Sequence, residues 1–344
     1  MHINKFLKAT SLAVGLASAT IAGAQAQTAE EFYGANTVNL IVSAAPGGAA
    51  DFFARSFAPY FARHLPGSPK IVVTNQPGAG GMVTAVQLQN TLPADGLNIA
   101  LLQRNNFYLP LINKDSITFD PREVTWLGSL AKEKYTVILW NDAPIENAED
   151  LFTTPVRIGA TGFANENRTL AAMMNDYFGT KFDIVAGYEG NEALALAIER
   201  GEVKGRLVTD NNLTSGNEAA WFADGTIKVP MQLGVERSDI LPDVPNIMEF
   251  SDDPAVLAMA NFMLAPLEAS RPLAVSSKVP ADRLEALKKA FDDAAADPEF
   301  LALMAKMQST VDPISGDEVK RIIDSLYETP ESVIVDIANL LKAE

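Results

Sequence analysis

Length, composition and charge restrict what the chain can be. Its 344 residues, 48% of them hydrophobic, suffice for roughly two domains with separate cores. The net charge of −16 argues against nucleic acid and against an anionic membrane surface as partners. The absence of cysteine excludes disulfide bonds and a lipid anchor on an N-terminal cysteine.

Residues 1–26 have the organisation of a secretory signal peptide. Lys5 and Lys8 form a basic start, residues 9–24 are apolar and small, and AQA at 24–26 fits a cleavage site. The alternative is a membrane anchor, but the apolar run is too short and too rich in Ala and Ser to span a bilayer comfortably. We therefore expect cleavage after Ala26, which changes the net charge from −16 to −18, and a soluble mature chain.

The first part of the mature chain alternates strand and helix patterns. Apolar runs at 38–43, 70–74 and 97–102 predict strands, and the segments 49–65 and 82–91 predict helices. This order favours a largely parallel sheet with helices on both faces.

Two of these strands end in a Pro-Gly turn before a helix, in the sequences APGGAAD (45–51) and NQPGAGG (75–81). The free N–H groups and the dipole of a helix start can bind an anion without a cationic side chain. Gly47 and Gly48 are candidates for such contact, although a glycine also simply permits a tight turn. Asp51 is better explained as a residue that caps the start of the helix. We expect the glycines of the second turn to shape the wall behind the site.

Polar residues at 103–106 follow the third predicted strand. Open α/β sheets bind ligands beyond the carboxyl ends of their strands. Asn105 is therefore a candidate contact, with an ordinary loop as the equal alternative.

A second series of strands and helices begins at residue 135. Strands are expected at 135–140, 156–159, 182–186, 205–209 and 227–234, and helices at 165–178, 191–200, 280–308 with a break at 297–298, 317–326 and 332–343. Two successive series predict two α/β domains.

The loops of the second series carry further candidates. Thr161 and Gly162 lie between a strand and a helix, where a hydroxyl and an N–H could meet the far end of an acidic ligand. Asn165 either contacts the ligand or caps the helix. Tyr188 lies in a glycine-flanked loop, with a core tyrosine as the alternative. Asp210 could accept a hydrogen bond from a ligand or from the hinge backbone.

Arg104, Arg168 and Arg271 are the arginines nearest to expected loops. A guanidinium group that holds a carboxylate by two hydrogen bonds adds strength and orientation. Arg168 is the first choice because it lies in the second-domain glycine-loop region, and a surface position is the alternative for each.

A set of motifs resembles, in order, those of the substrate-binding proteins of tripartite tricarboxylate transporters. The motifs are APGGAAD (45–51) with Ala54 and Arg55, NQPGAGG (75–81), PADG (93–96), IGATG (158–162), GYEG (187–190), GVER (234–237) and LPDVP (241–245). They extend over nearly the whole mature chain, and their order makes the resemblance specific.

The resemblance implies a two-domain α/β protein with the type II periplasmic binding fold. Each domain would be a mostly parallel sheet flanked by helices, with the ligand cleft between the domains. Residues 27–134 plus 257–344 would form the first domain and 135–256 the second. Such proteins are periplasmic, close like a hinge on a small carboxylated solute, and deliver it to one large and one small membrane permease subunit. We expect a monomer that is not an enzyme and uses no cofactor or metal.

In this family the first glycine loop faces the cleft. The resemblance therefore adds Ala45 to Gly47 and Gly48 as an expected ligand contact. The chain departs from the family at Ala50, where many members have Thr, and at 163–168, which reads FANENR where Ser or Thr and often His are usual. Glu166 would be unfavourable beside a carboxylate ligand unless it points away or pairs with Arg168.

The expected ligand is a di- or tricarboxylate, an aromatic acid or an amino acid. Two other functions stay open. One is a sensor that presents its solute to a membrane histidine kinase. The other, less favoured, is an exported α/β hydrolase: the chain has neither G-x-S-x-G nor H-E-x-x-H, and His64, the single histidine left after cleavage, is far from any serine turn.

Overall fold

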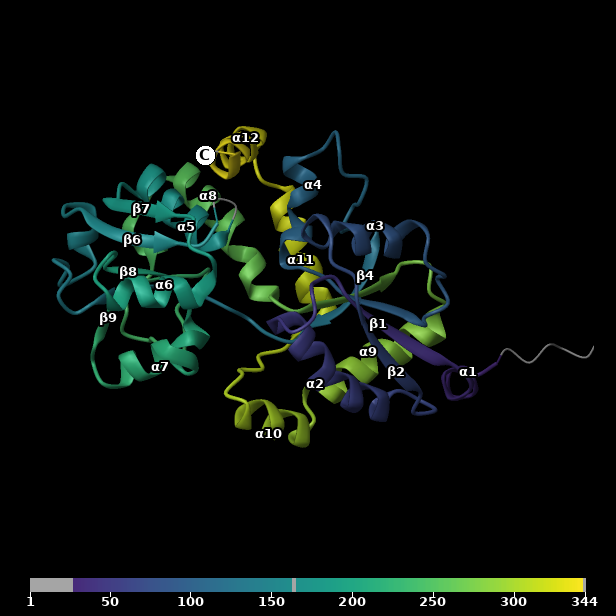
Figure 1. Cartoon of the computed structure of the whole chain (residues 1–344). Coiled ribbons are helices and arrows are strands. Elements are labelled where there is room, and N and C mark those ends of the chain that lie inside the picture. Colours follow the sequence, from purple (N-terminus) through teal and green to yellow (C-terminus); the bar gives the residue numbers. More distant parts are fainter. Residues whose placement is uncertain (1–26, 163–164, 343–344) are drawn as a thin grey trace, which may run out of the picture.

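The chain folds into two lobes, each built around one β-sheet (Figure 1). A computed structural model describes residues 27–162 and 165–342, so the predicted signal peptide at 1–26 lies outside the described residues. The first lobe contains a six-stranded sheet and the second a five-stranded sheet.

The sheet of the first lobe has the strand order β11-β4-β10-β3-β1-β2. Its strands are β1 (Thr37–Val42), β2 (Lys70–Asn75), β3 (Asn98–Leu101), β4 (Val124–Ser129), β10 (Pro272–Ser276) and β11 (Ile314–Ser315). β1 is parallel to β2 and β3, whereas β10 is antiparallel to β3 and β4. A strand from late in the chain therefore completes the middle of the sheet.

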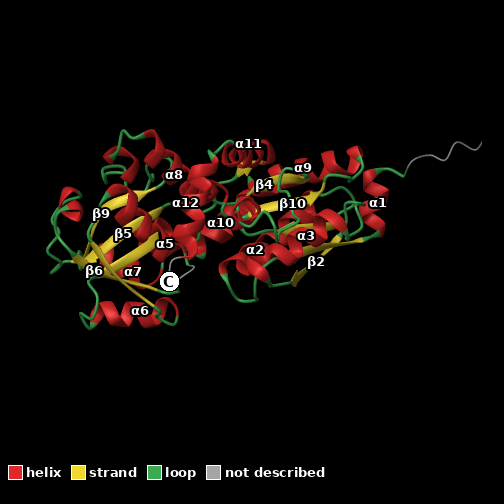
Figure 2. Ribbon diagram, turned by 90° about the horizontal axis from the view of Figure 1, so that it is seen from above, coloured by secondary structure: helices red, strands yellow, loops and turns green. Residues whose placement is uncertain are grey.

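Helices cover both faces of this sheet (Figure 2). α2 (Ala49–His64) and α9 (Ala281–Ala295) pack on one face, and α3 (Met82–Asn90) and α11 (Gly316–Tyr327) on the other. Successive side chains of a strand point to opposite faces, so Leu101 joins the α2 side and Ala100 the α3 side. On α2, Phe57 and Phe61 lie one turn apart and stack with ring centroids 5.4 Å apart.

Shorter helices complete the first lobe. They are α1 (Ala29–Ala35), α4 (Leu109–Ile112), α10 (Pro298–Lys306) and the 3₁₀ turns at Ala79–Gly81, Arg104–Phe107 and Ala265–Ala269. α1 lies at the end of the lobe that is farthest from the second lobe (Figure 1).

The sheet of the second lobe has the strand order β7-β6-β8-β5-β9. Its strands are β5 (Tyr135–Trp140), β6 (Val156–Ala160), β7 (Phe182–Ala186), β8 (Gly205–Thr209) and β9 (Ile227–Leu233). β6 is parallel to β7 and β8, and β5 is antiparallel to β8 and β9.

The helices of the second lobe also lie on both faces of its sheet. They are α5 (Glu166–Met173), which continues as a π-helical segment (Met174–Phe178), α6 (Gly190–Glu199), α7 (Gly216–Ala223) and α8 (Pro254–Leu264); 3₁₀ turns occur at Glu149–Phe152, Asp210–Leu213 and Ile247–Phe250. Val137 of β5 packs in the cluster that contains α5, whereas its neighbour Ile138 packs with Trp221 of α7.

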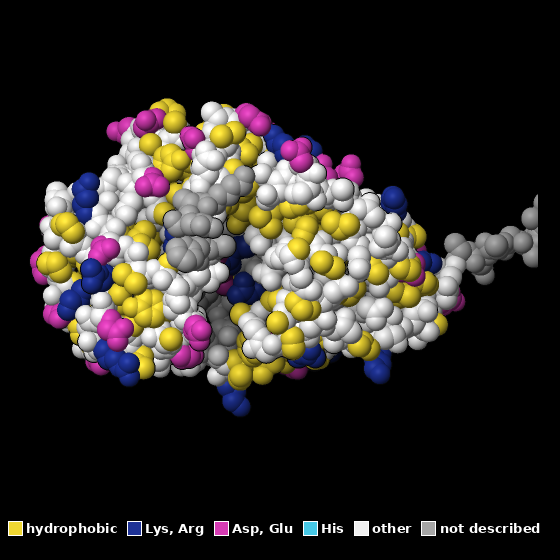
Figure 3. Space-filling model, turned by 45° about the horizontal axis from the view of Figure 1, so that its top comes forward, with side chains coloured by type: hydrophobic (Ala, Val, Ile, Leu, Met, Phe, Trp, Pro, Cys, Tyr) yellow, Lys and Arg dark blue, Asp and Glu magenta, His cyan; other side chains and the backbone are white. Residues whose placement is uncertain are grey.

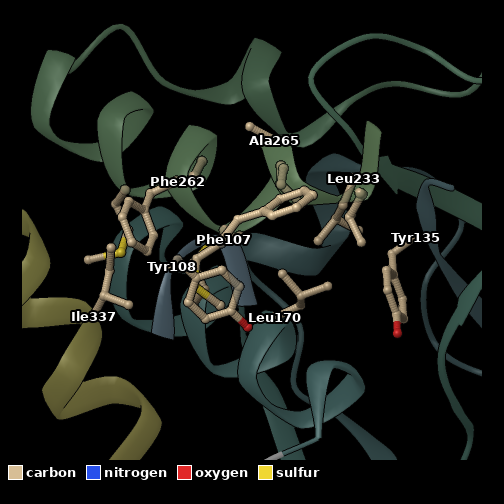
Figure 4. Close-up of a cluster of buried hydrophobic side chains, with 14 of the residues drawn as sticks. Phe107, Tyr108, Tyr135, Leu170, Leu233, Phe262, Ala265 and Ile337 are labelled. Carbon is tan, nitrogen blue, oxygen red and sulfur yellow. The ribbon is translucent and has the colours of Figure 1, made fainter. Parts of the chain in front are cut away.

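The joint between the lobes is packed with apolar side chains. The linking segments are 130–134 and 265–271, and α12 (Glu331–Lys342) lies across the joint, in contact with α4 of the first lobe and with α5 and α8 of the second. Figure 4 shows Phe107 and Tyr108 of the first lobe beside Leu170, Phe262 and Ile337. The rings of Tyr108 and Phe262 lie 5.7 Å apart.

The structure confirms two helix-flanked α/β lobes, and the predicted strands agree with β1–β3 and β5–β9 to within about two residues. The sheets are mixed, because antiparallel strands complete the parallel part of each one. β4, β10 and α8 were not predicted from the sequence. Among the described residues, no helix is both long and apolar enough to cross a bilayer.

Candidate functional site

A cleft of about 590 Å³ lies between the two lobes. The space-filling view in Figure 3 shows a hollow between the lobes with basic side-chain atoms in it. Segments of both lobes line the cleft: Ala44, Gly48–Ala50, Gln103–Asn105 and Tyr108 of the first, Thr161, Asn165–Asn167, Asn191, Leu207–Thr209 and Asn212 of the second, and Glu133, Tyr135, Ser270 and Arg271 at the joint.

The N-terminus of α2 forms the first-lobe wall of the cleft. Gly48 is the N-cap, with extended backbone and no side-chain cap. The first hydrogen bond of the helix runs from the Phe52 N–H to the Gly48 carbonyl. The N–H groups of Ala49 and Ala50 precede that bond and have no partner within the helix. An acidic ligand in the cleft can accept from them.

Asp51 holds this loop in shape and does not line the cleft. Its carboxylate accepts from the Gly47 N–H at 2.9 Å and the Asn75 side-chain amide at 2.9 Å, and pairs with Arg55 at 2.9 Å. The Arg55 and Gly47 hydrogen bonds lower the pKa of Asp51 to about 2. Gly47 has a φ of +84°, a left-handed conformation that favours glycine. Ala45 and Gly47 flank the cleft and are not among its lining residues.

The 3₁₀ turn after β3 carries polar residues into the cleft. Arg104 and Asn105 line the cleft. Asn106 is buried below them and donates to the Gly80 carbonyl at 2.9 Å, while a side chain at Gly81 would clash with Gln103. The second Pro-Gly turn therefore packs behind the lining residues.

The N-terminus of α5 forms the second-lobe wall. The Asn165 amide donates to the Thr161 hydroxyl at 2.7 Å, and that hydroxyl donates to Asn167 at 3.2 Å. The three side chains form one hydrogen-bonded row at the N-terminus of α5. Gly162 and Tyr188 line an adjoining shallow depression, together with part of this row.

Two predicted contacts lie elsewhere. Arg168 donates to the Leu340 carbonyl of α12 at 3.2 Å and is not a lining residue. Asp210 is buried, accepts from the Lys134 N–H at 3.2 Å and from the Ser238 hydroxyl at 2.5 Å, and binds the hinge backbone rather than the cleft. Burial raises the pKa of Asp210.

A cluster of four charged side chains crosses the floor of the cleft. Arg104 of the first lobe holds Glu166 of the second by two hydrogen bonds, one of them from Nε to Oε1 at 2.9 Å. Arg104 also pairs with Glu133 and donates to Ser270 at 3.1 Å. Arg271 donates to the other oxygen of Glu133 at 2.7 Å. Glu166 therefore pairs with Arg104, and not with Arg168.

Arg104 and Glu133 favour each other's charged form although both are largely buried. Burial opposes the charge of Glu133, but Arg104 and Arg271 outweigh it and lower the pKa of that carboxyl. Tyr135 donates to Glu166 at 3.1 Å, and burial followed by the Glu166 charge raises the pKa of the Tyr135 hydroxyl. The four side chains bring two formally positive and two formally negative groups to the floor of the cleft.

Sequence reasoning missed Glu133 and the partner of Glu166. Glu133 precedes β5 in a segment without a recognisable motif, and its role depends on residues 29 and 138 positions away. The sequence alone could have excluded Arg168 as the partner of Glu166, because side chains two positions apart on a helix point in different directions. That spacing argues against an ion pair with Arg168.

The described residues contain no group of three or more His, Asp or Glu side chains placed to hold a metal. His64 lies at the end of α2, hydrogen-bonded to Asp297 at 2.7 Å, and does not line the cleft.

Comparisons with known proteins agree with this architecture. A Cupriavidus necator protein named "UPF0065 protein in gbd 5'region" is 24% identical over 303 residues, which cover 85% of this chain and 86% of that protein. A TctC solute-binding protein from Polaromonas, solved without ligand, superposes with a TM-score of 0.69 at 20% identity, covering 87% of this chain and 98% of that one.

A second solved structure, an R. palustris protein with adipate, gives a TM-score of 0.60 at 15% identity and covers 88% of this chain and 97% of that one. The model of the tripartite tricarboxylate transporter family receptor matches residues 54–338. This match extends over most of the chain and agrees with the order of the sequence motifs. The chain belongs to the receptor family of the tripartite tricarboxylate transporters.

Proposed function

We propose that this receptor captures a small organic acid in the cleft between its lobes and delivers it to the large and small permease subunits of a membrane transporter. The observation that carries the proposal is the cleft itself, which is lined by polar groups of both lobes and by the N-termini of α2 and α5. A ligand that touches both walls favours the closed arrangement, because it gains contacts that the open form lacks.

The chemistry of the first-lobe wall supports an acid as ligand. Backbone N–H groups at the start of a helix favour an anion through hydrogen bonds and through the helix dipole. Gly48, Ala49 and Ala50 present that start to the cleft without a side chain in the way. Asn105, Thr161 and Asn165 complete the proposed contacts, and Gly162 and Tyr188 form the adjoining edge.

The remaining parts of the proposal follow from the family and the sequence. The protein is exported to the periplasm with cleavage after Ala26, acts as a monomer and performs no chemical reaction on its solute. The proposed domains are residues 27–134 plus 257–344 and residues 135–256, although this boundary divides α8 (Pro254–Leu264), which lies with the second lobe in Figure 1. The adipate in the relative from R. palustris is consistent with a carboxylated solute.

Native mass spectrometry of the purified receptor, followed by identification of any small molecule released on denaturation, tests the proposal directly. A panel of di- and tricarboxylates, aromatic acids and amino acids should then include a ligand that raises the melting temperature. Binding to the folded form alone stabilises it by about 2.7 kcal/mol at a hundredfold excess over Kd. If no acid shifts the melt and no acid is released, the proposal is wrong.

A further inference from the structure

Glu166 places a carboxylate of the protein inside a site proposed for a carboxylate ligand. Its side chain is 30% exposed and lines the cleft at the start of α5. A negative side chain in the first turn of a helix uses the same N-terminal field that would otherwise attract an anion. Both helices carry an acid in the first turn, but Asp51 of α2 does not line the cleft, whereas Glu166 of α5 does. The two walls of the cleft therefore differ.

Arg104 has little left to offer a second carboxylate. A guanidinium group has five N–H donors. In Arg104, Nε and Nη2 each donate to Glu166, and Nη1 donates to Glu133 and to Ser270. One N–H of Nη2 is left, so the paired hydrogen bonds that hold a carboxylate firmly are already made within the protein.

Arg271 does not replace Arg104 as a partner for a second ligand carboxylate. Its Nη2 donates to Glu133 at 2.7 Å and its Nη1 to the Ser270 carbonyl at 2.8 Å, while Nε is buried without a partner. With Glu133 and Glu166, the two arginines give a floor of zero net charge. Arg271 keeps three of its five N–H groups without a partner, but its positive charge is already matched by Glu133. A second ligand carboxylate at this floor would therefore add an uncompensated negative charge near Glu166, and like charges side by side are disfavoured.

The rest of the lining suits an uncharged polar group. Six carboxamide side chains line the cleft, each with a donor and an acceptor: Gln103, Asn105, Asn165, Asn167, Asn191 and Asn212. A hydroxyl or amide group can use both the donors and the acceptors of such side chains, whereas a carboxylate can use only the donors.

We infer that Glu166 is a specificity determinant, and that the solute carries one carboxylate, held at the α2 wall, and an uncharged hydroxyl or amide end toward Glu166. This inference rests on the proposed function and makes it narrower. It gives the pair between Arg104 and Glu166 a role in rejecting diacids of the same length.

Matched ligands test the inference on the unaltered receptor. The probes are succinate, glutarate and adipate, each compared with its monoamide, in which one carboxylate is replaced by a carboxamide of nearly the same shape. Isothermal titration calorimetry at pH 7.5 should show that the monoamide of the best-fitting length binds roughly tenfold or more tightly than its diacid.

The variant Glu166→Gln removes the charge and keeps the shape. It should reduce the preference for the monoamide at least tenfold, through a gain in diacid affinity, because Arg104 and Arg271 then share the single negative charge of Glu133. Glu199→Gln is the matched control: it removes one acid from the exposed face of α6, outside the cleft lining, and should keep the wild-type preference.

The outcomes separate this inference from the proposed function. Wild-type receptor that binds a diacid as tightly as its monoamide overturns the inference alone, and this comparison needs no variant to fold. An unchanged preference in a folded Glu166→Gln protein also overturns it. If neither member of any pair binds to wild type and the wider panel of acids fails too, both the inference and the proposed function are wrong.

Discussion

At the scale of single residues, the first turn of α2 carries an acid, Asp51, that does not line the cleft. Asp51 directs its carboxylate to Gly47, Asn75 and Arg55, and its charge is satisfied by these three partners. The N–H groups that follow Gly48 have no partner within the helix. Asp51 therefore fixes the loop without using the N–H groups that we propose for the ligand.

Asp51 makes stability depend on pH. Its folded pKa of about 2 lies below the ordinary value near 3.9, so its contribution is fully present above the ordinary value and is lost as pH falls through the folded one. Asp51→Asn should therefore be less stable than wild type at pH 7, and the gap should narrow at pH 3. Urea unfolding at both pH values measures the gap. Asp239→Asn, at an exposed position, serves as control, and a gap that widens in acid would contradict the assignment.

Substitutions at Gly48 can separate the stability of the fold from the binding of the ligand. Its backbone is extended and a Cβ there would meet its nearest atom at 3.9 Å, so a side chain fits. Gly48→Asp should cap α2, because Asp is a favoured N-cap residue, and should also place a charge where the ligand acid binds. We expect unchanged or higher stability together with loss of acid binding, measured by calorimetry.

Gly48→Ala controls for the added bulk at this position. It introduces a Cβ without a charge or a capping group, and should weaken acid binding much less than Gly48→Asp. Equal losses in the two variants would indicate that shape, and not charge, matters at the α2 wall.

The residue scale also shows where sequence reasoning stops. The Pro-Gly turn before α2 and the polar residues after β3 were predicted as site-forming segments, because the position of a loop at a strand end follows from the order of elements. The partner of Arg104 could not be derived in this way, since Glu166 is 62 positions distant and belongs to the other lobe. Contacts between lobes depend on how the lobes are oriented, which no local pattern encodes.

At the scale of elements, α12 is the helix that contacts both lobes at the joint. Its Ile337 is fully buried between α4 of the first lobe and α5 and α8 of the second, whereas Val335 is 49% exposed on the same helix. Ile337→Ala should lower the free energy of unfolding by about 2–5 kcal/mol, the usual cost of emptying a buried aliphatic site. Val335→Ala should change it by about 0.5 kcal/mol or less. Chemical unfolding of both variants checks the contrast, and equal losses would contradict this placement of α12.

Elements were predicted well where a local pattern defines them and poorly where the tertiary fold does. β5 and β8 have the predicted bounds, because their apolar runs end at turns. β10 was missed, since its five residues become a strand only by inserting between β3 and β4. That insertion also makes the first sheet mixed, a property that alternating strands and helices do not reveal.

At the scale of the whole molecule, the negative charge opposes the approach of an acid. The net charge of −16 extends over the full chain, whereas the arginines of the cleft are matched by two glutamates. The Debye length shortens from about 30 Å at 0.01 M salt to about 8 Å at 0.15 M, so added salt screens the distant charges first. The association rate constant of an acidic ligand should rise with salt, by less than the tenfold that marks strong steering.

Stopped-flow tryptophan fluorescence measures this rate. A ligand without net charge is the control and should show no such rise. A rate that falls with added salt would show that the arginines of the cleft dominate the long-range field.

The position of α1, at the end of the first lobe farthest from the second, has a practical consequence (Figure 1). The sequence contains no cysteine, so one introduced at Ala35, the exposed last residue of α1, would be the sole thiol of the protein. Maleimide coupling there would fix every molecule to a glass or gold surface in a single orientation. The cleft would then lie away from the surface, with the whole first lobe as a spacer, and the receptor could serve as the recognition layer of a reagentless sensor for its solute.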